Sequence, residues 1–188
     1  MKKLALIAAA FLGACITQAP PGEDLGPESL AVYEAFLTGY AEEGRVLNLA
    51  NRSTTLNIDA DAARTCAGDD ITFPDLAAVS QRTRPLSALA ANPRVRLVEA
   101  EAQRAIIAAR DPSTTIAAGR SVDEAVDDAF AAGLLQLSDV AFSADGGHAL
   151  MRFSFVCGAL CGHGELVHFV RENGAWSRAS RRCSGWVS

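Results

Sequence analysis

The sequence predicts an α+β fold in which N-terminal amphipathic helices pack on a C-terminal antiparallel β-meander. Three observations predict it. Apolar residues recur at helical spacing in the first part of the chain, and the period changes to two from Leu134 onward. Turn signals at Asp145-Gly146-Gly147 and Asn173-Gly174 separate the alternating segments. Because the helical and strand patterns are segregated along the chain, the α+β class is favoured.

The first expected helix begins at Pro27, which suits a first helical turn, and ends before Gly44. Its apolar positions are Leu30, Tyr33, Phe36, Leu37 and Tyr40. An aromatic stripe at helical spacing is typical of a core-facing surface, so we expect both tyrosines to pack on the sheet in preference to lining a pocket.

The middle of the chain is expected to contain short elements. They are a strand over 45–51, short helices between 59 and 93, a brief strand over 95–97, a helix over 99–110 and a helix over 121–132. The buried face of the helix over 99–110 is expected to hold Ala102, Ile106 and Ala109. Ser121 and Glu124 have the spacing of a capping box, which predicts the start of the helix that follows.

The C-terminal segments alternate between apolar and polar residues. The expected elements are one strand over 134–142, a hairpin turn at 145–147, a strand over 151–155, a strand over 167–169 and a type I′ turn at 173–174 that leads to Trp176. The alternation predicts one face packed against the helices and one face toward solvent. We place Arg152, Arg178 and His168 on the solvent face.

Residues Leu12-Gly13-Ala14-Cys15 resemble a bacterial lipobox, in which a lipid is attached to the cysteine and the preceding leader is removed. The leader is cationic at Lys2 and Lys3 and then apolar to Leu12, but it is too short to span a bilayer. An alternative is ordinary cleavage after Ala19. The resemblance implies a signal peptide over 1–14, a lipid-anchored Cys15 and an envelope location.

A flexible proline-rich tether is expected over 15–27, followed by a single domain over 28–188. The sorting rule of bacterial lipoproteins retains those with aspartate after the cysteine at the inner membrane. Ile16 occupies that position, so the resemblance implies the outer membrane, facing the periplasm.

Composition excludes several kinds of chemistry. The 17 Lys and Arg residues include Lys2 and Lys3 in the leader, so the mature chain has only arginine, and its formal charge changes from −5 to −7. Without lysine it cannot form a Schiff base or use a P-loop lysine. An acidic chain without a basic stripe also argues against a nucleic-acid partner.

The C-terminal third carries three motifs: Cys157-Gly158-Ala159-Leu160-Cys161-Gly162-His163-Gly164, Asn173-Gly174-Ala175-Trp176 and Trp186-Val187-Ser188. Together they resemble uncharacterised bacterial envelope proteins with a C-G-x-L-C-G-x-G loop, a G-x-W hairpin and a W-V-S tail. The resemblance covers about residues 137–188. It supports the meander and implies no activity.

Four cysteines other than Cys15 can form two disulfides in an oxidising compartment, with three possible connectivities. Cys157 and Cys161 flank a tight glycine-containing bend, and the loop of the resembling proteins carries both as a unit. On that resemblance we pair Cys157 with Cys161, which leaves Cys66 with Cys183.

Zinc binding, redox chemistry and hydrolysis are less favoured functions for these residues. A zinc site would use Cys157, Cys161, His163 and Cys183, but the spacing lacks the usual C-x₂-C knuckle. A redox-active Cys157/Cys161 pair would need the C-x-x-C spacing at a helix start. A hydrolase would draw on the histidines, but no G-x-S-x-G motif is present.

Two functions remain open. We expect a non-catalytic envelope lipoprotein that contacts another envelope protein or the envelope itself, with the membrane as a partner through the lipid anchor and with no metal or cofactor. The alternative is a small periplasmic enzyme or ligand-binding domain with a pocket near the 157–168 loop. Its candidate binding residues are His163, Glu165 and His168.

Overall fold

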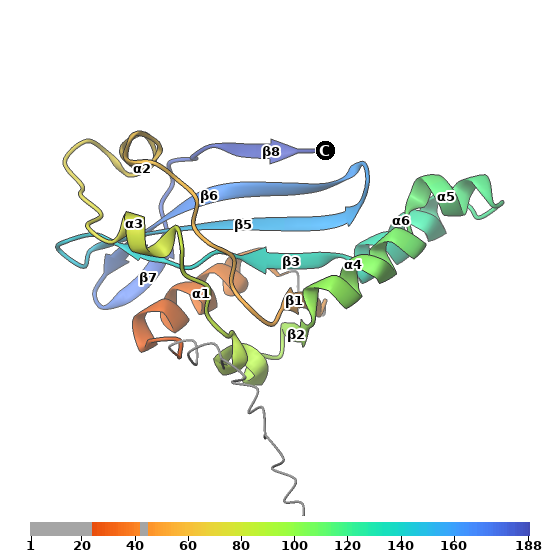
Figure 1. The fold of residues 1–188 in the computed structure, drawn as a ribbon, viewed down its shortest axis with the longest axis horizontal. Helices are drawn as coiled ribbons and strands as arrows, with labels where there is room; N and C mark the ends of the chain where they lie inside the picture. The colour runs from red at the N-terminus through yellow and green to blue at the C-terminus, as the bar shows by residue number, and fades with distance from the viewer. Residues whose placement is uncertain (1–23, 42–44) are drawn as a thin grey trace, which may run out of the picture.

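The computed structural model describes residues 24–41 and 45–188 (Figure 1). The elements in chain order are α1 (Pro27–Tyr40), β1 (Leu47–Ala50), α2 (Ala60–Ala67), α3 (Leu76–Val79), the 3₁₀ helix η1 (Ser87–Ala91), β2 (Val95–Val98), α4 (Ala100–Ala109), α5 (Pro112–Ala117), α6 (Val122–Ala132), β3 (Leu134–Leu137), β4 (Ala141–Phe142), β5 (His148–Gly158), β6 (Cys161–Glu172), β7 (Ala175–Arg178) and β8 (Gly185–Val187). Within these ranges no helix has the length and apolar character needed to cross a membrane. The lipobox, Cys15 and most of the expected tether lie outside the described residues.

The described strands form one mixed sheet, which confirms the α+β class. Its order is β2-β1-β3-β5-β6-β7, with β4 paired to β5 and β8 paired to β6. The strands β3, β5, β6 and β7 are antiparallel neighbours in succession. However, β1 runs parallel to both β2 and β3, so the sheet extends beyond the expected antiparallel strands. Helices α4 to α6 lie in the chain between β2 and β3 and provide the long connection that a parallel arrangement requires.

Helix α1 covers one face of the sheet. Its side chains Val32, Tyr33, Phe36 and Leu37 are buried against a cluster from the strands. The strand members of this cluster include Leu135, Leu137, Met151, Phe153, Phe155, Val167 and Phe169. The first expected helix therefore packs on the sheet through its predicted apolar stripe.

The other face of the sheet carries a second, smaller core, so the prediction of one solvent-exposed face is wrong. Leu150 and Leu166 pack there against residues from the segment between β1 and η1. The other members of this core are Leu56, Ala63, Cys66, Phe73, Val79 and Ala141. Arg152 and Arg178 are exposed as expected, but they lie on different faces, because Arg152 pairs with Leu166 and Arg178 pairs with Phe169.

Helices α4, α5 and α6 project beyond the end of the sheet (green in Figure 1). The buried face of α4 consists of Gln103 and Ile107, and the expected residues Ala102, Ile106 and Ala109 are exposed. Burial of Gln103 has a specific cause, because its side-chain amide donates a hydrogen bond to the carbonyl of Ala132 at the end of α6. The expected capping box of α6 is present, with the Ser121 hydroxyl accepting from the Glu124 amide.

The strand expected over 134–142 is interrupted between β3 and β4. Asp139 lies in the interruption, and its side chain is 0% exposed. Its carboxylate accepts from the Val140 amide at 2.9 Å and pairs with Arg82 and with Arg84, the latter at 3.4 Å. A buried carboxylate needs charged partners of this kind. Asp139 reaches these partners from the irregular segment between β3 and β4, which interrupts the expected strand.

Candidate binding site

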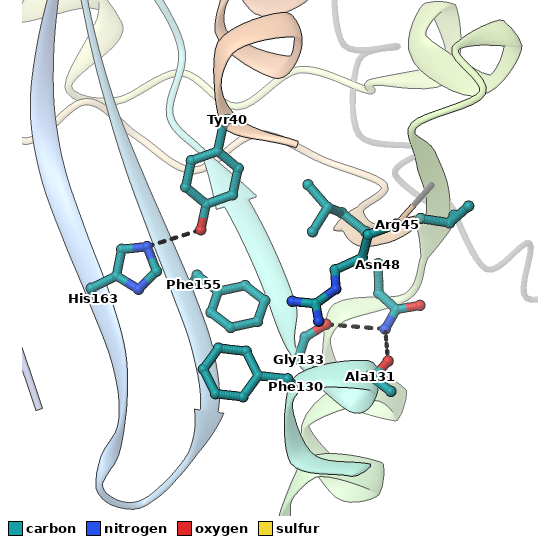
Figure 2. A pocket seen from close by; sticks show the side chains of 10 residues that line it. Tyr40, Arg45, Asn48, Phe130, Ala131, Gly133, Phe155 and His163 are labelled. Atoms are coloured by element: carbon teal, nitrogen blue, oxygen red, sulfur yellow. Dashed lines mark hydrogen bonds between the residues drawn. The ribbon is translucent and has the colours of Figure 1, made fainter. Parts of the chain in front are cut away.

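Tyr40 and His163 meet at the end of the sheet where α1 stops (Figure 2). Tyr40 is the last residue of α1, and His163 lies on β6 directly across from Phe155 of β5. The Tyr40 hydroxyl and His163 Nε2 are 2.9 Å apart. Burial raises the pKa of Tyr40, so its hydroxyl keeps its proton and is available to donate to the imidazole.

A continuous series of aromatic rings surrounds this pair. We call Tyr40, Phe130, Phe153, Phe155 and His163 the aromatic cluster. The His163 ring centroid lies 5.9 Å from that of Tyr40 and 5.7 Å from those of Phe153 and Phe155. Phe130 of α6 stacks on Phe155 at 5.9 Å. The cluster therefore bridges α1, the sheet and α6, and ring contacts at such distances stabilise its arrangement.

A pocket of about 220 Å³ opens beside the cluster. It is lined by Tyr40, Arg45, Val46, Leu47, Asn48, Phe130, Ala131, Gly133, Phe155 and His163. At its base the Asn48 amide donates to the carbonyls of Ala131 and Gly133, each at 3.0 Å (Figure 2). These two bonds satisfy carbonyls at the C-terminal end of α6, which fixes the helix against β1.

Gly133 allows the close approach of α6 to the sheet. A Cβ atom at this position would lie 2.1 Å from Cζ of Phe155, well inside van der Waals contact. The Phe155 ring therefore occupies the space that a side chain at position 133 would need. This contact sets the wall of the pocket formed by Phe130 and Phe155.

The three candidate residues from the sequence do not form one site. His163 belongs to the aromatic cluster, whereas Glu165 pairs with Arg178 at 2.6 Å. His168 is buried on the opposite face, where its Nε2 lies 3.0 Å from Nδ1 of His148. Its expected place on a solvent face is therefore wrong. Burial, followed by the charges of His148 and Arg181, lowers the pKa of His168.

An apolar groove of about 510 Å³ adjoins the aromatic cluster on the side away from α1. Its lining consists of Pro112, Val126, Phe130, Cys157, Leu160, Cys161, Gly162, His163, Val187 and Ser188. Four of its large apolar side chains are exposed: Val126 by 37%, Phe130 by 40%, Leu160 by 86% and Val187 by 85%. Apolar side chains gathered around a groove are typical of a binding surface.

Both expected disulfides are present, and one of them lines the groove. Cys157 and Cys161 are joined across the β5–β6 turn, with Cα atoms 5.1 Å apart. Cys66 of α2 is joined to Cys183 with a Cα separation of 4.8 Å, which ties α2 to the segment before β8. Because these cysteines are paired, they supply no thiolates for a zinc site at Cys157, Cys161, His163 and Cys183. No metal-holding group of three or more His, Cys, Asp or Glu side chains occurs in the described part of the chain.

The position of the C-terminal strand β8 depends on Gly164. A Cβ atom here would lie 2.5 Å from Nε1 of Trp186, so the indole of β8 lies directly over this glycine. Trp186 is thereby fixed on the face opposite His163, and its neighbour Val187 pairs with His163 on the groove side. The strand β8 thus contributes one side chain to the groove.

Several residues of the site were not identified from the sequence. Phe130 was not singled out, Leu160 and Val187 were noted only as members of motifs with no binding role, and Tyr40 was assigned to the core. One available signal was the spacing of Val122, Val126 and Phe130, which repeats every four residues on α6. Buried Ala125 and Ala129 supply the core face of the same helix, and Phe130 of this second apolar stripe contacts the sheet through Phe155 while its ring remains 40% exposed.

Comparison with known proteins adds no further assignment. No protein-family model, curated protein or solved structure matches this chain.

Proposed function

We propose that the protein is a non-catalytic lipoprotein of the bacterial cell envelope that binds another envelope protein through the apolar groove. The observation that carries this proposal is the exposure of Phe130, Leu160 and Val187 around the groove. Burying a large apolar side chain contributes about 1.5–3 kcal/mol, so these three residues offer a substantial driving force for association.

The envelope location in this proposal is supported by the resemblance of residues 12–15 to a lipobox. A lipid on Cys15 would hold the outer-membrane protein from its N-terminal side, with the domain facing the periplasm. The described chain enters the domain near β7, where Glu28 pairs with Arg171 at 3.2 Å and accepts from Trp176. The groove lies at the other end of β6, about 30 Å away at 3.3 Å per residue. A groove at the end of β6 opposite the start of the described chain would remain accessible to a partner in a lipid-anchored protein.

Crosslinking in the native envelope tests the binding role. A photoreactive amino acid at Leu160 should give a discrete crosslinked product, and the same residue at exposed Asp70 should not. Adding Phe130→Ser should remove the Leu160 product, because it removes a wall of the groove. If Leu160 and Asp70 give the same products, the groove is not a specific binding surface.

Fractionation tests the anchor. Cys15→Ser should leave the leader uncleaved by the lipoprotein pathway and move any processed protein into the soluble fraction. A variant that is processed normally and still sediments with membranes would contradict the lipobox interpretation.

A second candidate, a small periplasmic ligand-binding domain, is favoured by the pocket beside Tyr40 and His163. A small molecule bound there should shift the amide resonances of Asn48 and Gly133 in ¹⁵N NMR spectra. If small molecules extracted from the periplasm leave these resonances unchanged, this candidate is excluded.

A further inference from the structure

Helix α6 carries an apolar stripe that faces solvent. Val122, Val126 and Phe130 are spaced four residues apart, so they lie on one side of the helix. Val122 is 59% exposed and Val126 is 37% exposed. Val126 and Phe130 line the groove, so the stripe extends the groove along the helix toward its N-terminus.

Two carboxylates border this stripe. Asp123 and Asp127 are one helical turn apart and follow Val122 and Val126 directly, which places them along the edge of the stripe away from the core face. Both are exposed, and neither carboxylate takes part in an ion pair or hydrogen bond within residues 24–41 and 45–188.

The other acidic residues of α6 have partners. Asp128 pairs with Arg120 at 2.5 Å, and the Glu124 carboxylate accepts from the Ser121 hydroxyl at 2.7 Å. The contrast leaves Asp123 and Asp127 as the charges that an incoming partner would meet beside the apolar stripe.

We propose that the groove and the α6 stripe together bind a basic amphipathic segment of an envelope protein. The segment's apolar side chains occupy the groove between Phe130, Leu160 and Val187. Its cationic side chains pair with Asp123 and Asp127. This inference rests on the proposed function and adds that the bound segment of the partner is basic and amphipathic.

An anionic membrane surface fits the same face less well. The two carboxylates would approach lipid phosphates of the same sign, which opposes docking at low ionic strength. A protein segment with cations at helical spacing meets both the apolar and the acidic part of the surface.

The test uses synthetic peptides and the full chain carrying Cys15→Ser. One peptide of about 14 residues places leucines at helical spacing with lysines elsewhere, and its counterpart has glutamate in place of every lysine. Titration followed by fluorescence anisotropy should give affinity for the lysine peptide at least about tenfold higher than for the glutamate peptide. The difference should shrink as salt is added.

Variants then separate the two parts of the surface. Asp123→Asn with Asp127→Asn should weaken binding of the lysine peptide about three- to tenfold, and Leu160→Ser should weaken it at least about tenfold. The matched controls are Asp69→Asn with Asp70→Asn, and Ile106→Ser on α4, all at exposed positions. The controls should leave the affinity unchanged, and circular dichroism should show that every variant is folded.

Equal affinity for the two peptides, or equal effects of the α6 and control variants, would overturn the proposal. Binding to phosphatidylglycerol vesicles in preference to the lysine peptide would overturn it in favour of a membrane. If the Leu160 crosslink forms in the envelope while the peptides are not distinguished, only the basic partner is wrong. If neither crosslink nor peptide binding is found, the proposed function fails as well.

Discussion

Helices α1 and α6 lie at the two sides of the aromatic cluster and use their apolar residues differently. On α1, Tyr33 and Phe36 are buried against the sheet. On α6, the alanines face the core, while Val122, Val126 and Phe130 remain exposed. The apolar side chains of α1 therefore stabilise the fold, whereas the large apolar side chains of α6 lie exposed beside the proposed binding groove.

The two disulfides also differ in their location relative to the core and the groove. Cys66–Cys183 joins residues 117 positions apart and secures the second core to the segment before β8. Cys157–Cys161 closes only the hairpin turn beside the groove. The longer disulfide therefore secures the fold, and the shorter one lies beside the proposed binding surface.

Removal of the long-range disulfide should have the largest effect. Cys66→Ser with Cys183→Ser should lower the free energy of unfolding by about 5 kcal/mol, against about 2 kcal/mol for Cys157→Ser with Cys161→Ser. The reason is that closing the longer loop removes more conformational entropy from the unfolded chain. Urea denaturation of the two double variants measures both values, and equal losses would break the division between the two regions.

Replacing one phenylalanine on each helix by alanine compares how much the two rings contribute to the stability of the fold. Phe36→Ala should cost about 3–5 kcal/mol because it leaves a cavity in the core, whereas Phe130→Ala should cost about 1 kcal/mol because that ring is partly exposed. Chemical denaturation gives both values. A loss at Phe130 as large as that at Phe36 would assign the α6 stripe to the fold.

The two tyrosines of α1 provide a finer comparison within one helix. The buried Tyr33 hydroxyl donates to the Ser138 carbonyl at 2.8 Å, so Tyr33→Phe leaves a buried acceptor and should cost about 1–3 kcal/mol. Tyr40→Phe removes a bond to His163 that is only partly buried and should cost about 1 kcal/mol or less. Thermal and urea unfolding should rank the two variants in this order; the reverse ranking would contradict the assignment.

A modest pH effect is expected from the buried histidine pair. The pKa of His168 is lowered in the folded protein, so the unfolded chain takes up its proton first as the pH falls below about 6.5. The stabilisation linked to unprotonated His168 is therefore present above about pH 6.5. It declines as the pH falls, by at most about 1.4 kcal/mol per pH unit for one proton. His168→Gln should reduce the decline measured by urea denaturation, and His163→Gln should retain it.

Local features of the fold could be predicted from the sequence because each depends on a few neighbouring residues. Asn173 and Gly174 have φ values of 52° and 82°, as the expected type I′ turn requires. The helix α1 and the start of α6 at Ser121 were likewise recognisable. In each case the chemistry that determines the structure lies within about one or two turns of chain.

Features that depend on distant contacts could not be predicted. The parallel pairing of β1 with β2 and β3 has no local signal. On α4, Gln103 is buried because it bonds to Ala132, a contact that hydrophobic periodicity does not detect. The pocket of the aromatic cluster depends on a hydrogen bond between Tyr40 and His163, which are 123 residues apart. The sequence therefore identified His163 as a candidate but not Tyr40, its hydrogen-bond partner.

The junction at Gly133 has a mechanical consequence. It is the single residue between α6 and β3, and β3 is held between β1 and β5. The Phe155 ring fills the space beside this glycine, so the helix end and the sheet are packed directly against each other at the junction. A force applied to α6 is therefore transmitted to the interior of the sheet, where the strand resists it through its pairs on both edges.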